Sequence, residues 1–123
     1  MMDDIRVLIV DDEEDLAATI AERLEIRGIK TRTASDGDMA LNLIKTHPPH
    51  VVILDLMMPG IGGLEILKKI KVLDLNIPVI LLTGYGSKEH SIEGINLGAF
   101  DYVLKPCNLD DLITKIQAAV RSK

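Results

Sequence analysis

The chain of 123 residues has the usual size of one domain, and its 47% hydrophobic content with only 2% aromatics predicts an aliphatic core. The formal net charge of −5 argues against direct nucleic-acid binding, and the single cysteine excludes an internal disulfide. Because no apolar stretch approaches the ~20 residues that span a bilayer, we expect residues 1–123 to form one soluble, cytoplasmic domain without a membrane partner.

Five short apolar runs, each bounded by Gly, Pro, Asp or Asn, predict five β-strands. Four of them are rich in Val, Ile and Leu without polar alternation, which is typical of parallel strands buried on both faces. The second run alternates between apolar and polar residues and is expected at the edge of the sheet. In chain order the predicted strands cover residues 5–10, 29–34, 51–54, 77–82 and 100–104.

Apolar residues at helical spacing follow each predicted strand. Gly28 and Gly98 are expected to end the first and fourth helices, and Asn108 is expected to cap the fifth, with Asp111 three residues later. Strict alternation of strands and helices predicts an α/β domain with a parallel sheet between two layers of helices. The predicted helices lie around residues 16–24, 40–44, 64–70, 87–98 and 109–120.

Polar residues follow four of the predicted strands at the point where each strand ends. Asp11 and Asp12 follow the first, Asp55 the third, Thr83 the fourth and Lys105 the fifth. Taken singly, each aspartate could be a helix N-cap, the threonine a turn residue and the lysine a solvated surface residue. Because parallel sheets bind ligands at the carboxyl ends of their strands, we interpret all five as one site.

Three clustered carboxylates repel one another, so the predicted site needs a cation or the ammonium of Lys105 for balance. Oxygen ligands of this kind suit Mg²⁺, which also takes oxygens from a phosphoryl group. With Lys105 and Thr83 binding the phosphoryl oxygens, Asp55 could serve as a carboxylate nucleophile.

Four motifs contain these residues and together span nearly the whole chain. They resemble, in order and approximate spacing, the motifs of the receiver domains of bacterial two-component response regulators. This resemblance implies a three-layer, flavodoxin-like (βα)5 fold whose five parallel strands have the order 2-1-3-4-5, as in the chemotaxis member of the family. The motifs are Val10-Asp11-Asp12-Glu13, Leu54-Asp55-Leu56-Met57-Met58-Pro59-Gly60, Leu82-Thr83-Gly84 and Tyr102-Val103-Leu104-Lys105-Pro106.

The resemblance also implies a role for each acidic residue of the site. Asp55 would be the phosphoacceptor. Asp12 and Asp55 would ligate Mg²⁺ or Mn²⁺ directly with the backbone carbonyl of Met57, while Asp11 would act largely through water. No organic cofactor is implied. Relatives often carry an acidic residue where this chain has Gly62, a position outside the core site.

The resemblance implies that the remaining site residues bind the phosphoryl group and change conformation in response to it. Lys105 would contact the phosphoryl group and Asp55, and the Lys105–Pro106 bond would be cis. Thr83 would move toward the phosphoryl group and Tyr102 would turn inward, so that these two form a switch pair. Gly94, inside the predicted fourth helix, indicates either a less stable helix or close packing against a neighbour.

The implied partners are a sensor histidine kinase or phosphotransfer protein, which donates the phosphoryl group, and an unidentified downstream effector. The face formed by the fourth helix, fifth strand and fifth helix would change on phosphorylation and could also form a homodimer. Such a protein is a regulator that assists its own phosphorylation and dephosphorylation, and is not otherwise an enzyme. It could act alone or belong to a longer regulator.

Three other functions compete with this interpretation. A haloacid-dehalogenase-type phosphatase would place its nucleophile in an Asp-x-Asp turn after the first strand, and Asp11-Asp12-Glu13 lacks that spacing. A flavin-binding protein would need a phosphate loop where this chain is acidic. A receiver that docks partners without being phosphorylated is a third alternative, which the presence of all five site residues disfavours.

Overall fold

The computed structural model describes residues 4–57, 62–74, 76–84, 88–106 and 108–122, and within them five strands alternate with five helices. The alternation predicted from the sequence is confirmed, while the expected start of the fourth helix near Ser87 lies outside the described residues. In chain order the elements are β1 (Arg6–Val10), α1 (Glu14–Ile26), β2 (Lys30–Ala34), α2 (Gly37–Thr46), β3 (Val51–Asp55), α3 (Gly63–Leu73), β4 (Val79–Thr83), α4 (Lys88–Asn96), β5 (Asp101–Leu104) and α5 (Leu109–Arg121).

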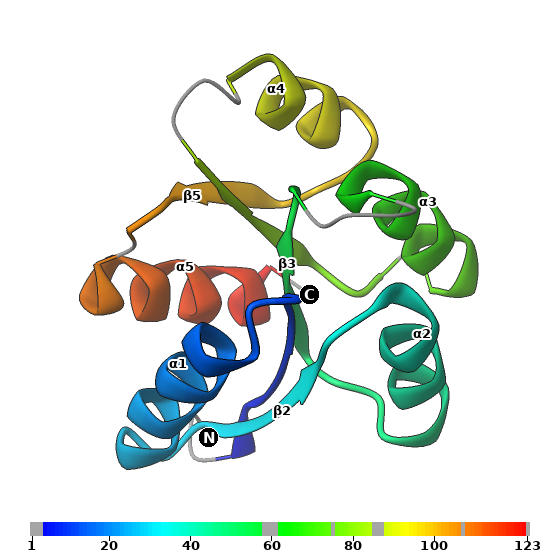
Figure 1. Cartoon of the computed structure of the whole chain (residues 1–123). Coiled ribbons are helices and arrows are strands. Elements are labelled where there is room, and N and C mark those ends of the chain that lie inside the picture. The colour runs from blue at the N-terminus through cyan, green and yellow to red at the C-terminus, as the bar shows by residue number, and fades with distance from the viewer. Residues whose placement is uncertain (1–3, 58–61, 75, 85–87, 107, 123) are drawn as a thin grey trace.

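The strands form one parallel sheet with the order β2-β1-β3-β4-β5, which confirms the predicted flavodoxin-like topology. Helices α1 and α5 cover one face of the sheet, and α2, α3 and α4 cover the other (Figure 1). Since all strands are parallel, their carboxyl ends lie along one edge, where the polar residues of the predicted site are found.

Alternate side chains of the central strands feed two apolar clusters, one on each face of the sheet. Ile53 of β3 packs toward α1 and α5, while its neighbours Val52 and Leu54 pack toward α2 and α3. Every residue of β3 and β4 is buried, as expected of parallel strands covered on both faces. These two strands therefore form a rigid base for the residues at their ends.

The ends of the helices follow the sequence signals. Gly28 and Gly98 follow α1 and α4 with φ angles of +85° and +108°, a left-handed conformation that glycine adopts without strain. Asn108 caps α5, because its side-chain oxygen accepts a hydrogen bond from the backbone N–H of Asp111 at 3.2 Å. Farther along α5, Lys115 forms an ion pair of 2.7 Å with Asp101 of β5.

One expectation about the strands is wrong. The fifth run was expected to be buried on both faces, but β5 is an edge strand that exposes Tyr102 and Leu104, while Val103 alone is buried against α5. Among the described residues no strand pairs with the outer edge of β5, and Tyr102 and Leu104, on the face opposite Val103, are exposed. The edge position of β2, by contrast, is as predicted.

Helix α4 contacts the sheet through small residues. Its buried positions are Ser91 and Gly94, whereas Ile92 and Ile95, which the apolar pattern places in this helix, are exposed. A Cβ atom at Gly94 would clash with a methyl group of the buried Leu81 in β4. Of the two explanations open for Gly94, the close approach of α4 to β4 is therefore the one that the structure supports.

Gly63, the first residue of α3, lies close to a neighbouring backbone. A Cβ atom there would stand 2.5 Å from Leu56 Cα and 2.8 Å from Asp55 O. We expect Gly63→Ala to lower the free energy of unfolding by about 1–3 kcal/mol, because main-chain atoms cannot rotate away from the added methyl group. Urea denaturation followed by circular dichroism measures this loss.

The matched control is Gly84→Ala, because a Cβ atom at Gly84 would meet no atom of the described residues within 4 Å. This variant should change the free energy of unfolding by less than about 0.5 kcal/mol. Equal stability of the two variants would contradict the packing described for Gly63.

Candidate functional site

The structure brings the three predicted carboxylates together at the carboxyl ends of the central strands. Asp11 and Asp12 follow β1, and Asp55 is the last residue of β3. One carboxylate oxygen from each lies within 4.8 Å of the other two. Asp11 and Asp55 are buried, while Asp12 is exposed. The side chains therefore form an acidic pocket that solvent reaches from the side of Asp12.

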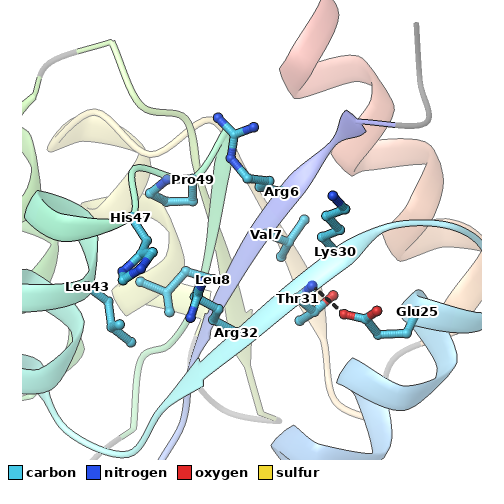
Figure 2. Close-up of a pocket in the computed structure, with 10 residues that line it drawn as sticks. All are labelled: Arg6, Val7, Leu8, Glu25, Lys30, Thr31, Arg32, Leu43, His47 and Pro49. Carbon is cyan, nitrogen blue, oxygen red and sulfur yellow. Dashed lines mark hydrogen bonds between the residues drawn. The ribbon is translucent and has the colours of Figure 1, made fainter.

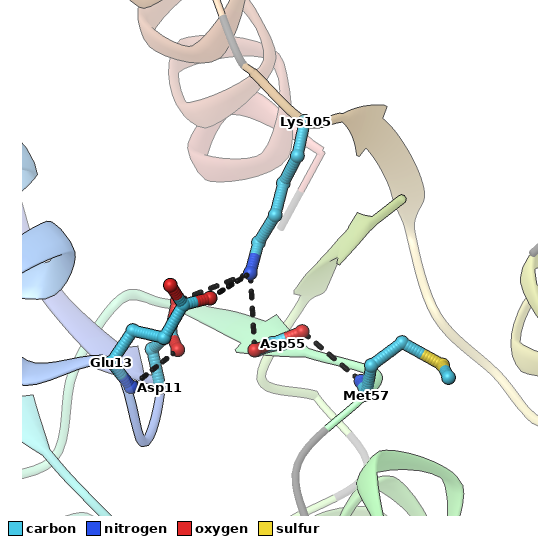
Figure 3. A network of polar contacts seen from close by, with 5 residues as sticks. All are labelled: Asp11, Glu13, Asp55, Met57 and Lys105. Atoms are coloured by element: carbon cyan, nitrogen blue, oxygen red, sulfur yellow. Dashed lines mark hydrogen bonds and ion pairs between the residues drawn. The ribbon is translucent and has the colours of Figure 1, made fainter. Parts of the chain in front are cut away.

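Lys105 reaches into this pocket from the chain that follows β5 (Figure 3). Its Nζ lies 3.1 Å from Asp55 Oδ2 and 3.6 Å from Asp11 Oδ2. The Lys105–Pro106 peptide bond is cis, as the family resemblance implies. One ammonium group thus contacts two buried carboxylates that come from different strands.

Glu13 is a third carboxylate in contact with this lysine. Its Oε1 lies 3.3 Å from Lys105 Nζ, and its side chain is 63% exposed, so water screens the pair. The sequence pattern does not indicate this contact, since an acidic residue before a helix is well explained by the helix dipole alone. Only its position beside Asp12 in the first motif could have suggested it.

The turns after β1 and β3 orient the two buried carboxylates in the same way. Asp11 Oδ1 accepts a hydrogen bond of 2.9 Å from the backbone N–H of Glu13, and Asp55 Oδ1 accepts one of 3.0 Å from that of Met57. Each aspartate therefore has one oxygen held by the backbone while its Oδ2 faces Lys105. The backbone of Met57 is held beside Asp55 by the same contact, and the Met57 side chain is exposed.

The two proposed switch residues lie in different surroundings. Thr83, at the end of β4, is buried, and its Oγ1 has no hydrogen-bond partner among the described residues. A buried hydroxyl left unpaired costs roughly 1–3 kcal/mol, so this group is ready to bind an incoming oxygen. Tyr102 is 39% exposed on β5.

Burial and charge shift the pKa values of Asp11 and Lys105. Burial raises the pKa of Asp11, and despite the backbone hydrogen bond from Glu13, the charge of Asp55 helps to bring it to about 6. Burial lowers the pKa of Lys105, but the hydrogen bond and charge of Asp55, with the charge of Asp11, outweigh it and raise the pKa above its usual value. The lysine is therefore firmly protonated, and the pocket still favours additional positive charge.

These features fit a divalent metal ion with oxygen ligands. Asp11, Asp12 and Asp55 form the one group of three potential ligand residues found in the described part of the chain. Asp11 Oδ2 is buried, has no hydrogen-bond partner among the described residues and meets only the 3.6 Å ion pair with Lys105. A carboxylate set with an unsatisfied oxygen suits Mg²⁺ or Mn²⁺ better than a metal that prefers nitrogen or sulfur.

Comparison with protein families matches residues 7–117 to the response regulator receiver domain. Among curated proteins, the chain is 38% identical to regulatory protein AtoC of Escherichia coli strain K12 over 94% of its own length and 25% of that protein. It is 33% identical to response regulator MprA of Mycobacterium sp. strain KMS over 95% of its own length and 51% of that protein. The chain thus spans a quarter to a half of these relatives.

Solved structures show the same similarity in three dimensions. The receiver domain of Francisella response regulator 1452 superposes with a TM-score of 0.88 at 38% identity, over 98% of this chain and all of that one. The receiver domain of NtrX from Brucella abortus gives a TM-score of 0.91 at 36% identity, over 95% of this chain and 99% of that one. Among the described residues, no helix is long and apolar enough to cross a membrane.

The raised pKa of Asp11 generates a prediction about stability and pH. The folded protein keeps the Asp11 proton up to about pH 6, whereas the unfolded chain loses it near 3.8, so stability falls as the pH rises through this interval. In EDTA at about pH 7.5, Asp11→Asn should therefore be more stable than the unchanged protein by on the order of 1–3 kcal/mol, and the difference should shrink toward about pH 4. Urea denaturation at both pH values measures it.

Glu22→Gln serves as the control, because it removes one negative charge from an exposed residue of α1. Its effect should stay below about 0.5 kcal/mol at either pH. If Asp11→Asn showed no stabilisation at the higher pH, the repulsion inferred within the pocket would be absent.

Proposed function

The chain belongs to the response regulator receiver domains, and from this membership we propose that it accepts a phosphoryl group on Asp55 from the phosphohistidine of a sensor histidine kinase or phosphotransfer protein. The observation that carries the proposal is the state of Asp55: a buried carboxylate with Oδ1 held by Met57 N–H and Oδ2 paired with Lys105 at 3.1 Å. The protein is thus a phosphoacceptor switch of a two-component system, a signalling protein rather than an enzyme that turns over a substrate.

In the proposed reaction, an oxygen of Asp55 attacks the phosphorus atom while the bond from phosphorus to the donor histidine nitrogen breaks. The electron pair of that bond returns to the imidazole, and an acyl phosphate remains on the protein. Lys105, whose ammonium already lies beside Asp55, neutralises charge on the phosphoryl oxygens. The unpaired hydroxyl of Thr83 donates a hydrogen bond to one of them.

Asp12 and Asp55 are the residues that we propose as direct ligands of Mg²⁺ or Mn²⁺, with the backbone carbonyl of Met57 as a third ligand and Asp11 acting through water. The close approach of the three carboxylates supports this assignment. When bound, the ion supplies positive charge for the oxygens of the transferred group. Burial and the charge of Asp55 raise the pKa of Asp11, so added positive charge beside these carboxylates would be favourable.

Phosphorylation is proposed to change the surface formed by α4, β5 and α5, with Thr83 and Tyr102 as the switch pair. The added group carries about −1.5 to −2 charges, which would draw Thr83 and Lys105 toward it. Four exposed apolar side chains support this route, because they give the surface a hydrophobic area for a downstream effector or for a second copy of the chain. They are Ile92 and Ile95 of α4, and Tyr102 and Leu104 of β5.

Several further features belong to the same proposal. Residues 1–123 are assigned to a single receiver domain that works in the cytoplasm and does not itself bind nucleic acid.

A second candidate function is a docking module that works without phosphorylation. It is favoured by one observation, namely that the apolar surface on α4 and β5 is already exposed in the unphosphorylated chain.

The direct test is incubation with acetyl phosphate and Mg²⁺ followed by intact mass spectrometry. We expect a gain of one phosphoryl group, because Asp55 is the buried nucleophile of the acidic pocket. Asp55→Asn should gain none, while Asp74→Asn, a change at the exposed end of α3, should react normally. Failure of the unchanged protein to react with this donor and with a panel of histidine kinases would favour the docking module.

Helix α4 lies on the proposed route of the signal. Amide hydrogen exchange in α4 (Lys88–Asn96) should change when a beryllofluoride complex mimics the phosphoryl group, since α4 follows directly on the β4 end that carries Thr83. Exchange in α2 (Gly37–Thr46), which lies away from that end, should remain the same. Unchanged protection in α4 with a bound mimic would rule out this route.

A further inference from the structure

A groove lies on the surface of the sheet far from the acidic pocket, between the first halves of β1 and β2 and the end of α2. It has a volume of about 390 Å³, which is within the range of pockets that hold small molecules. Figure 2 shows Leu43 and His47 on one side of it and the residues of β1 and β2 on the other. The proposed phosphoryl transfer uses none of these residues.

Basic side chains dominate the opening of the groove. Arg6 of β1 lies opposite Lys30 of β2, and Leu8 lies opposite Arg32. Because alternate residues of a strand share a face, Arg6 and Arg32 project to the same side as Leu8, which packs in the cluster under α2. His47 adds a ring nitrogen from the end of α2. Four nitrogen-bearing side chains therefore surround one opening.

No carboxylate in the described part of the chain balances these cations. Arg6, Lys30 and Arg32 form no ion pair with any described residue. The Nε of Arg6 donates to the carbonyl of Pro48 at 3.3 Å, which positions its guanidinium at the rim. Like charges directly opposite on neighbouring strands repel each other, so an anion bound between them would relieve a repulsion.

Glu25 is the acidic residue that lines the groove, and it is held by the backbone of Thr31, which also lines the groove. Its Oε2 accepts a hydrogen bond of 2.7 Å from the backbone N–H of Thr31. That bond occupies an N–H group on the edge strand β2, which an extended peptide would need in order to add to the sheet. The contact thus favours a compact ligand over a peptide strand.

The base of the groove is apolar. Leu8 and Pro49 are buried, and Leu43 is half-buried against the same core. An inorganic ion would contact only the basic rim, whereas a molecule with an apolar body would also cover the half-buried side chain of Leu43. Arginine side chains bind phosphate with paired N–H groups, which makes a phosphate group the natural head of such a ligand.

We propose that the groove between β1, β2 and α2 binds a small organic phosphate, with its phosphate group at the basic rim formed by Arg6, Lys30 and Arg32 and its apolar part on Leu43. Binding at this place would give the receiver a second input, separate from phosphorylation of Asp55. The ligand is identified by its chemistry: a dianionic head and an apolar body that fits about 390 Å³.

The test is titration of ¹⁵N-labelled protein with phenyl phosphate in EDTA, where phosphorylation of Asp55 does not occur for lack of a metal. We expect saturable shifts of the amide signals of residues 6–8 and 30–32, and weaker binding of inorganic phosphate, which lacks the apolar body. Lys30→Gln and Arg32→Gln should each weaken binding about tenfold, because each removes one charge-assisted contact. Both residues are exposed, and the dispersion of the amide spectrum verifies the fold of each variant.

Lys45→Gln is the matched control, because it removes one positive charge from an exposed residue of α2 outside the groove. This variant should bind phenyl phosphate as the unchanged protein does. An equal loss with Lys45→Gln, shifts that do not saturate, or shifts confined to the edge near Lys105 would overturn the proposal. Tighter binding of a short glutamate peptide at the groove would overturn it in favour of an acidic protein partner.

Discussion

The attraction of one ammonium group for several carboxylates is the interaction on which the site depends. Lys105 lies within 3.6 Å of Asp11, Glu13 and Asp55, which come from the ends of two strands and the start of a helix. Without that positive charge, buried aspartates at the ends of adjacent strands would repel each other strongly. The parallel sheet supplies the geometry, since it brings residues more than forty positions apart to one edge.

The same arrangement explains why a single positive charge is not enough. Burial, with the charge of Asp55, keeps the pKa of Asp11 at about 6 even with Lys105 beside it, so its ionised form is poorly stabilised at neutral pH. A divalent ion or protonation of a carboxylate can offset the negative charge of the pocket. A phosphoryl group that binds together with a metal ion adds negative charge, and the ion offsets it. The carboxylates that prepare the pocket for a divalent ion therefore lower the stability of the folded protein, as residues of functional sites frequently do.

The sequence predicts much of this structure because strand ends coincide with polar residues. Asp11, Asp55, Thr83 and Lys105 can each be placed from the pattern of short apolar runs alone. The orientation of α4 could not be predicted in this way, because it depends on the contact of Gly94 with Leu81, which turns Ile92 and Ile95 outward. The exposed face of β5 and the pairing of Glu13 with Lys105 likewise arise from tertiary neighbours. A net charge of −5 also conceals the basic groove, because a sum over the chain carries no information on position.

The hydrogen bond between Glu25 and the backbone of Thr31 has a consequence for the behaviour of the protein at high concentration. Open edge strands are templates on which other chains can add and start aggregates. At the β2 edge this contact removes one attachment point, and the charges of Lys30 and Arg32 repel a second copy of the same edge. The two charges and this hydrogen bond therefore oppose edge-to-edge aggregation of the protein whether or not a ligand occupies the groove.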